Sequence, residues 1–216
     1  ELLTNTIPTN TVSSSAQVAD RISGSFQQGF EFTGTIKNKP DSWSVATSMI
    51  HARSQMASAG NSRNAVLVFG GRYGNTAAGT FNNGAPACTE EYNGTSWSEV
   101  NDLPSGRYQI FGAGNSEGAL SGDGSASANS GVEYYNGTNW AEVASLITAE
   151  YRSVGIGDGG ADDALVVGGV PQSSCFQRYD LPGNAWSELT NPPIGVNNIG
   201  GTGTTDAAII ANYSPA

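Results

Sequence analysis

The chain has 216 residues, of which 38% are hydrophobic and only 13% charged, with 29 glycines and a net charge of −10. The acidic balance excludes a nucleic-acid partner, because phosphate binding needs a basic face, and no apolar run is long enough for a membrane-spanning helix. Few charges and many Gly, Ser, Thr and Asn residues favour an all-β protein with many tight turns.

Residues 1–29 stand outside the repeats that follow and are rich in Ser, Thr and Asn. This composition is typical of an extended arm or linker. Two alternatives remain open for it: a disordered leader, or an attachment arm that becomes ordered against a partner.

From about residue 30 onward the chain repeats itself. Its tryptophans lie in related contexts, such as SWSEVNDL and NWAEVASL, at separations of 54, 43 and 46 residues. A four-stranded unit with a period of about 40–50 residues predicts the blade of a β-propeller. The residues that mark the register are Trp43, Trp97, Trp140 and Trp186.

Each repeat divides into four β-patterned segments bounded by turn residues. Within the last pair, Asn93-Gly94 and Asn136-Gly137 predict two-residue turns of type I′, which need positive φ at both positions. Tyr92 and Tyr135 precede their tryptophans by five residues, so we expect each pair to face across its hairpin. In the third repeat, YDLPGNAW begins at Tyr179 and predicts a longer loop.

An apolar strand that ends in Gly-Gly, followed by a Tyr strand and a Trp strand, resembles the kelch repeat. The resemblance covers about residues 30–216 and implies a kelch-type β-propeller. The second repeat has ALSGDG in place of the glycine doublet, and the fourth has IIANYS. The residues that carry the full pattern are Gly70, Gly71, Tyr92 and Trp97, and Gly168, Gly169, Tyr179 and Trp186.

The repeats predict four blades of four antiparallel strands. Blade one is expected at about 50–103, blade two at about 104–146 and blade three at about 147–192. The last blade would combine 193–216 with 30–49, because a ring held only by sequential contacts leaves a seam with unpaired strand edges. The alternative is a piece of a larger propeller.

The sequence offers little catalytic chemistry. His51 is the only histidine, so no Ser/His/Asp set can be assembled without it. Cys88 and Cys175 each lie four residues before a third-strand Tyr, which places them in opposite blades, too far apart for a disulfide. Galactose-oxidase-type propellers hold copper through Tyr, His and Cys, and the residues here do not match that site. We therefore expect no enzyme and no cofactor.

The acidic run GDGGADD contains Asp158, Asp162 and Asp163 and is a weak Ca²⁺ candidate, since Ca²⁺ prefers carboxylate ligands. Its alternative is an acidic turn between the first and second strands. The run lacks the alternating ligand spacing of a dedicated calcium loop.

Arginines recur near the innermost strand of each blade. Arg53 and Arg107 lie ten residues after their tryptophans, and Arg152 is shifted by two. They are candidate channel residues that bind an anion, or else ties that hold neighbouring blades through hydrogen bonds to carbonyls.

EEYNGTSWSEVNDL, with RISGSFQQGFEFTGTI upstream, resembles the kelch-like repeat proteins encoded by tailed bacteriophages of aquatic bacteria. The resemblance implies a non-enzymatic virion surface protein (a capsid decoration, fibre or tail-associated protein), anchored through residues 1–29 to other virion proteins or to copies of itself. The first alternative is an extracellular carbohydrate-binding module that uses Tyr73 and Phe81 in the longest loop, with a host surface glycan as ligand. The second is a kelch-type adaptor that binds a peptide.

Overall fold

The computed structural model describes residues 45–73, 84–124, 130–157, 163–170, 174–196 and 199–211. Within these ranges the secondary structure consists of β-strands and loops, which confirms the all-β prediction. The same ranges contain no helix of the length and apolarity that a membrane crossing requires. Several predicted features lie outside the described residues: the arm 1–29, Trp43, Phe81, Asp158 and Asp162.

Three antiparallel sheets of four strands form the body of the protein. The first sheet contains β2 (Ala57–Ser62), β3 (Ala65–Phe69), β5 (Thr89–Tyr92) and β6 (Trp97–Val100). The second sheet contains β7 (Phe111–Asn115), β8 (Gly118–Gly122), β9 (Val132–Tyr135) and β10 (Trp140–Val143). The third sheet contains β11 (Val154–Ile156), β12 (Asp163–Val167), β13 (Phe176–Asp180) and β14 (Ala185–Glu188).

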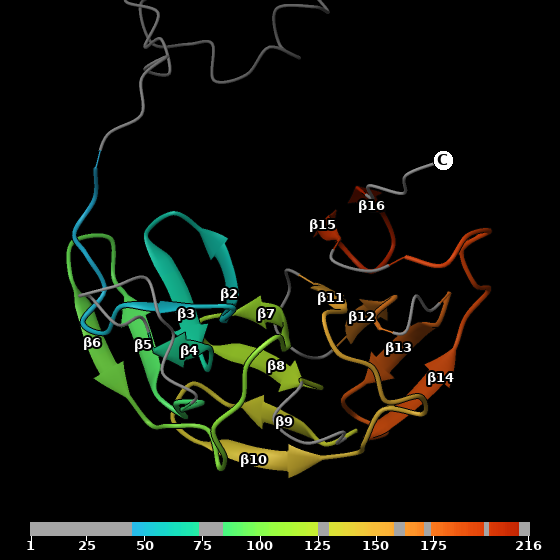
Figure 1. Cartoon of the computed structure of the whole chain (residues 1–216), viewed down its shortest axis with the longest axis horizontal. Coiled ribbons are helices and arrows are strands. Elements are labelled where there is room, and N and C mark those ends of the chain that lie inside the picture. The colour runs from blue at the N-terminus through green and yellow to red at the C-terminus, as the bar shows by residue number, and fades with distance from the viewer. Residues whose placement is uncertain are drawn as a thin grey trace, which may run out of the picture. The chain divides into compact units, whose positions relative to one another are not determined.

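Two smaller pairs accompany these sheets. The strands β15 (Gly200–Gly203) and β16 (Ala208–Ala211) form a two-stranded hairpin, and β1 (Arg53–Ser54) pairs with β4 (Arg72–Tyr73). Figure 1 shows the three sheets and the β15–β16 hairpin side by side, with β2, β7, β11 and β15 innermost and β6, β10 and β14 outermost. Contacts run from β2 to β7, from β7 to β11 and from β11 to β15. This is a β-propeller-like arrangement.

The hairpin between the third and fourth strands differs from the predicted type I′ turn. Tyr92 pairs directly with Trp97, so the loop between them has four residues, and only Gly94 has a positive φ, of 91°. The Asn93 side chain closes this loop, because its Oδ1 accepts hydrogen bonds from the N–H groups of Thr95 and Ser96, each at 3.0 Å. Asn is favoured here for its side-chain oxygen. The type I′ prediction was therefore wrong.

The equivalent turns keep the same loop length. Asn136 Oδ1 accepts from Thr138 and Asn139 at 3.0 and 2.8 Å in the second sheet. In the third sheet the two additional residues of YDLPGNAW extend the strands by one pair, Asp180 with Ala185. The loop there does not grow, contrary to the prediction.

The expected aromatic pairs across these hairpins are confirmed. The ring centroids lie 5.1 Å apart for Tyr92–Trp97, 5.1 Å for Tyr135–Trp140 and 5.0 Å for Tyr179–Trp186. Pairs of this kind contribute up to about 1 kcal/mol each to sheet stability.

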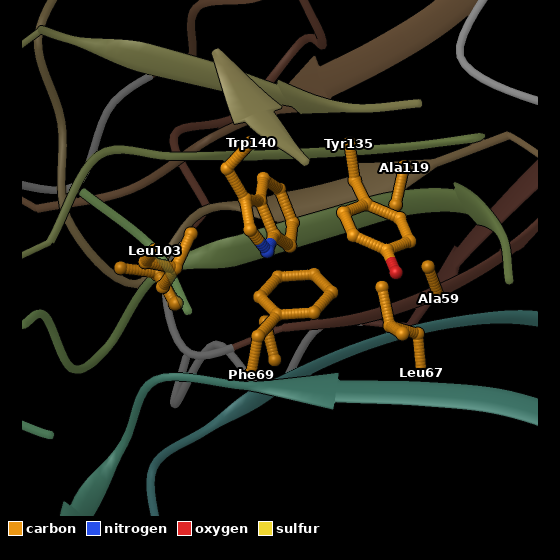
Figure 2. Close-up of a cluster of buried hydrophobic side chains, with 9 residues drawn as sticks. Ala59, Leu67, Phe69, Leu103, Ala119, Tyr135 and Trp140 are labelled. Atoms are coloured by element: carbon orange, nitrogen blue, oxygen red, sulfur yellow. The ribbon is translucent and has the colours of Figure 1, made fainter. Parts of the chain in front are cut away.

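Neighbouring sheets bury a hydrophobic cluster between them. Figure 2 shows Phe69 and Leu67 of the first sheet directed toward Trp140 and Tyr135 of the second. The rings of Phe69 and Trp140 meet edge to face at 5.0 Å. A second cluster, which includes Phe111 and Tyr179, joins the second and third sheets.

The sheets fill the same space with different residues. Ala57 pairs with Phe69 in the first sheet, and at the equivalent pair of the second sheet Phe111 faces Gly122. The phenylalanine of this pair is therefore on the second strand in the first sheet and on the innermost strand in the second sheet. A Cβ atom at Gly122 would lie 2.8 Å from the Phe111 ring, so this glycine is required by packing.

Candidate functional site

A channel of about 660 Å³ runs between the innermost strands. Its wall comes from β2, β7, β11 and β15 and consists of small and apolar residues with a few Ser, Thr and Asn side chains. This lining offers backbone groups, hydroxyls and amides, and no charged side chain.

The channel wall is built from small residues because the inner strands approach each other closely. A Cβ atom at Gly112 would lie 2.5 Å from the carbonyl oxygen of Ser58, and one at Gly155 would lie 2.4 Å from that of Gly112. These positions are fifteen residues after their tryptophans, so one repeat position makes the same backbone contact at the first two junctions, whereas a Cβ atom at the equivalent Gly201 would meet the Ile156 side chain. Glycine is needed where two backbones meet.

A second cavity of about 350 Å³ shares Met56, Ile110 and Ser153 with the lining of the channel. Its other lining residues are Gln55, Gln109, Arg152 and Ile199. We call this cavity the channel mouth.

The polar residues of the channel mouth occupy one repeat position, twelve residues after each tryptophan. Gln55, Gln109 and Arg152 have positive φ angles of 55°, 57° and 63°. Their backbones are linked in series, because Gln109 N–H donates to the Gln55 carbonyl at 2.9 Å and Arg152 N–H donates to the Gln109 carbonyl at 3.0 Å. A left-handed backbone conformation is costly for residues other than glycine. The hydrogen bonds between these backbones stabilise it here.

The inner-strand arginines occupy two different environments. Arg53 does not line the channel: its guanidinium is buried and donates to the carbonyl of Cys88 at 2.5 Å, to that of Gly70 at 3.3 Å and to Glu90 Oε1 at 2.8 Å. Arg107 is also buried and donates to the Gly131 carbonyl at 2.8 Å. Both guanidiniums bind backbone carbonyls, as the tying alternative predicts, but their partners lie in the same repeat as the arginine and not in a neighbouring blade.

Arg152 is exposed at the channel mouth, and its guanidinium lies 5.6 Å from the ring centroid of Tyr151. Of the three arginines proposed for the channel, it is the one that faces a cavity. Its two-residue shift in the sequence is the signal that separates it from Arg53 and Arg107.

A buried acceptor recurs two residues before each third-strand tyrosine. Glu90 accepts from the N–H groups of Ile50 and His51 at 2.7 and 3.2 Å. In the third sheet, Gln177 Oε1 accepts from Ile147 N–H at 2.8 Å. The acceptor thus fixes the segment that enters the sheet at its innermost strand. Sequence reasoning missed this position, although its fixed spacing from the tyrosines was visible.

The second sheet holds Glu133 at this position, and Arg107 Nη2 pairs with it. Burial raises the pKa of Glu133 to about 7, Arg107 opposes this rise, and Glu142 adds to it. Desolvation penalises the charged form of a carboxyl group.

Asp123 is a second buried carboxyl group that sequence reasoning missed. It stands where the other sheets have Gly70 and Gly168, and it keeps their left-handed conformation with φ 69°. Burial raises the pKa of Asp123 to about 7, although hydrogen bonds from Gly124 N–H at 2.7 Å and Ser153 Oγ at 2.9 Å oppose this rise. The available signal was an Asp in place of the first glycine of the doublet.

The other predicted site residues are dispersed. Tyr73 is partly exposed beside His51, with ring centroids 6.2 Å apart. His51 Nδ1 lies 3.3 Å from Glu99 Oε1 and 3.6 Å from Glu90 Oε1. Neither cysteine forms a disulfide among the described residues: Cys88 is buried and Cys175 is half-buried.

The calcium candidate is represented in the described residues by Asp163 alone. Both of its carboxylate oxygens accept from Arg178, with an Nε–Oδ1 distance of 2.7 Å, so its charge is already paired. The described residues hold no group of three His, Cys, Asp or Glu side chains arranged to bind a metal ion.

Comparison with known proteins gives a fold likeness. No family model matches the chain, and no curated protein matches it. Among solved structures, "Structure of YjhT" is similar with a TM-score of 0.57 at 16% sequence identity. The match covers 74% of this chain and 58% of that one, so this chain spans less than two thirds of its neighbour. At this identity the likeness concerns the fold alone.

Proposed function

We propose that this protein is a non-enzymatic structural and binding protein: a closed four-bladed kelch-type propeller displayed on a virion surface and anchored through residues 1–29. The three sheets are then blades one to three, and the β15–β16 hairpin is the inner half of blade four. The observation that carries the display role is that the recurring buried arginines, Arg53 and Arg107, bind carbonyls and carboxylates of their own repeats and so serve the fold.

The first support for closure is the position of Thr47. In the third sheet, Trp186 Nε1 donates to the carbonyl of Ala144 at 2.8 Å, and Ala144 lies four residues after the preceding tryptophan. Trp97 Nε1 donates to the carbonyl of Thr47 at 2.9 Å, and Thr47 lies four residues after Trp43. Thr47 therefore takes the place relative to Trp97 that Ala144, just after the outermost strand of the second sheet, takes relative to Trp186.

The second support is the exposure of Ile209. This side chain is 73% exposed, whereas the residues at its equivalent positions, Leu67, Leu120 and Leu165, are at most 2% exposed. Large apolar side chains at a core position imply a covering layer. In our proposal residues 30–44 supply that layer as the third and fourth strands of blade four.

The platform role is supported by how the ionisable residues are used. The guanidinium groups of Arg53 and Arg107 donate to backbone carbonyls and to buried carboxylates. The described residues that line the channel include no charged side chain. A rigid scaffold of this kind displays its surface loops to a binding partner, which is how propellers without an active site usually function. Anchoring through residues 1–29 follows from their composition and from the phage resemblance.

A carbohydrate-binding role is the second candidate, and the channel mouth favours it. A cavity of about 350 Å³ combines amide and guanidinium groups with an apolar floor. Ligand sites pair apolar walls with a few oriented polar groups. In this version Gln55, Gln109 and Arg152 contact the sugar, whereas Tyr73 lies in β4 and is not among the residues that line the cavity.

Deletion of residues 1–29 tests the anchor. The truncated protein is expected to keep the thermal unfolding midpoint of the full chain while it loses association with its particle or with copies of itself, measured by co-sedimentation. Retained association overturns the anchor. A glycan array run with wild type and Arg152→Ala tests the second candidate, which uniform absence of binding would contradict.

A further inference from the structure

We propose that protonation of the buried carboxyl groups of Asp123 and Glu133 holds the second sheet against its neighbours, so that this part of the propeller loses stability as the pH rises toward neutral. The inference does not rest on the role proposed above. It follows from a comparison of one repeat position in three sheets.

Each sheet places two acidic or amide residues directly opposite one another on its third and fourth strands. The pairs are Glu90 with Glu99, Glu133 with Glu142, and Gln177 with Glu188. Like charges that face each other across strands are destabilising. The three sheets handle this repulsion differently.

In the first sheet, basic side chains and backbone N–H groups surround the pair of glutamates. Glu90 receives Arg53 Nη2 at 2.8 Å and two backbone N–H groups, from Ile50 and His51. The His51 imidazole stands between Glu90 and Glu99. The Glu90 carboxylate therefore accepts hydrogen bonds from several donors.

The third sheet removes the charge. Gln177 stands in place of the glutamate; it accepts from Ile147 and Thr148 N–H at 2.8 and 3.3 Å and donates to the Thr148 carbonyl at 3.2 Å. The neutral amide of Gln177 thus forms hydrogen bonds with the backbone of the entering segment and places no negative charge opposite Glu188.

The second sheet keeps an arginine beside its glutamate but lacks the backbone donors of the first sheet and the neutral amide of the third. Its residue equivalent to Ile50 and Ile147 is Pro104, which has no N–H to donate, and its residue equivalent to His51 is Ser105. Arg107 Nη2 binds Glu133 Oε1, and Oε2 has no hydrogen-bond partner among the described residues. Because Glu142 faces it, the unmatched oxygen favours a bound proton, in agreement with its raised pKa.

Asp123 places a second carboxyl group at the junction of the second and third sheets. Ser153 donates to it from the segment before β11, and Glu150 of the same segment adds negative charge. Arg107 is the cation that lowers the pKa of both Asp123 and Glu133. Arg107 pairs directly with Glu133 and acts on Asp123 only through its charge, while Glu150 and Glu142 add further negative charge.

The direction of the effect follows from proton linkage. Both groups have a folded-state pKa of about 7, above the ordinary values of 3.8 and 4.5. Each therefore stabilises the folded state below the ordinary value, and this contribution is lost as pH rises to about 7. The unfolding equilibrium constant increases by up to about tenfold per pH unit for each group in that window.

The experiment measures urea unfolding of the full chain from pH 4 to 9 for wild type, Glu133→Gln, Asp123→Asn and the matched control Glu90→Gln. Wild type is expected to lose stability steadily from about pH 5 to 7. Each of the first two variants should reduce that slope by about half, since each removes one of two titrating groups, while the control keeps the wild-type slope.

A carboxyl ¹³C NMR titration of the folded wild type supplies a readout that does not depend on any variant folding. Two carboxyl groups with midpoints near pH 7 are expected, and Glu133→Gln and Asp123→Asn each remove one. The proposal is overturned if all buried carboxyl groups titrate below pH 5, or if neither variant changes the slope.

Discussion

The indole of Trp97 donates a hydrogen bond to the carbonyl oxygen of Thr47 at 2.9 Å, across fifty residues of chain. The same bond joins Trp186 to Ala144 at 2.8 Å. Each of these two indoles thus binds the carbonyl of a residue that lies four positions after the preceding tryptophan. In the remaining case the indole of Trp140 donates to Thr89 Oγ1 at 3.2 Å, also in the neighbouring sheet.

Replacing Trp97 with phenylalanine removes this bond and keeps an aromatic partner for Tyr92. We expect Trp97→Phe to lower the free energy of unfolding by about 0.5–1.5 kcal/mol, the net worth of one hydrogen bond. Urea unfolding measures the change, with Trp186→Phe as the matched variant. An unchanged stability in both would show that these bonds do not hold the junctions.

Alanine at Gly155 tests the close approach of the inner strands. Its Cβ would lie 2.4 Å from the Gly112 carbonyl oxygen, so the strands must separate. We expect Gly155→Ala to destabilise the protein by about 1–3 kcal/mol, as overpacking does. Gly200→Ala is the control, because nothing lies within 4 Å of its added Cβ. Equal melting temperatures for both variants would contradict the tight channel.

Replacing Arg53 with lysine keeps the positive charge and removes the forked hydrogen-bond geometry of the guanidinium. The Arg53 guanidinium reaches two strand carbonyls and Glu90 together, which a single ammonium group does not reproduce. We expect Arg53→Lys to lower the free energy of unfolding by about 3 kcal/mol, at the low end for breaking a buried pair. Arg152→Lys, at an exposed site, should change it by less than about 0.5 kcal/mol. A similar small effect at both sites would show that Arg53 is not a structural tie.

Ile209 tests whether residues 30–44 complete blade four. In the full chain, Ile209→Ala should cost about 2–5 kcal/mol if the side chain is covered. In a chain that lacks residues 1–44 the same substitution should be nearly neutral. Ile147→Ala, at a half-exposed site, is expected to have a small effect in both backgrounds. A near-neutral Ile209→Ala in the full chain would mean that another element closes the ring, or that it stays open.

The repeat register was predictable because it is local. Tyr92 and Trp97 are five residues apart, and strand alternation with a short turn forces them together whatever surrounds the hairpin. The four-segment division of each repeat rests on the same local signals. The turn type was not predictable from Asn93-Gly94, because a two-residue and a four-residue loop both use that pair, and the Asn93 side chain decides between them through its own hydrogen bonds.

The sequence by itself determined the β class, the strand order within each sheet and the facing aromatic pairs, since all of these depend on side-chain period and turn residues over a few positions. Only the tertiary structure decided which arginine is buried and which faces the channel mouth. It also decided that Arg107 pairs with Glu133, while Asp123 accepts its side-chain hydrogen bond from Ser153. Burial and the field of neighbouring charges depend on residues from different sheets, and no local pattern in a single repeat records which neighbours those will be.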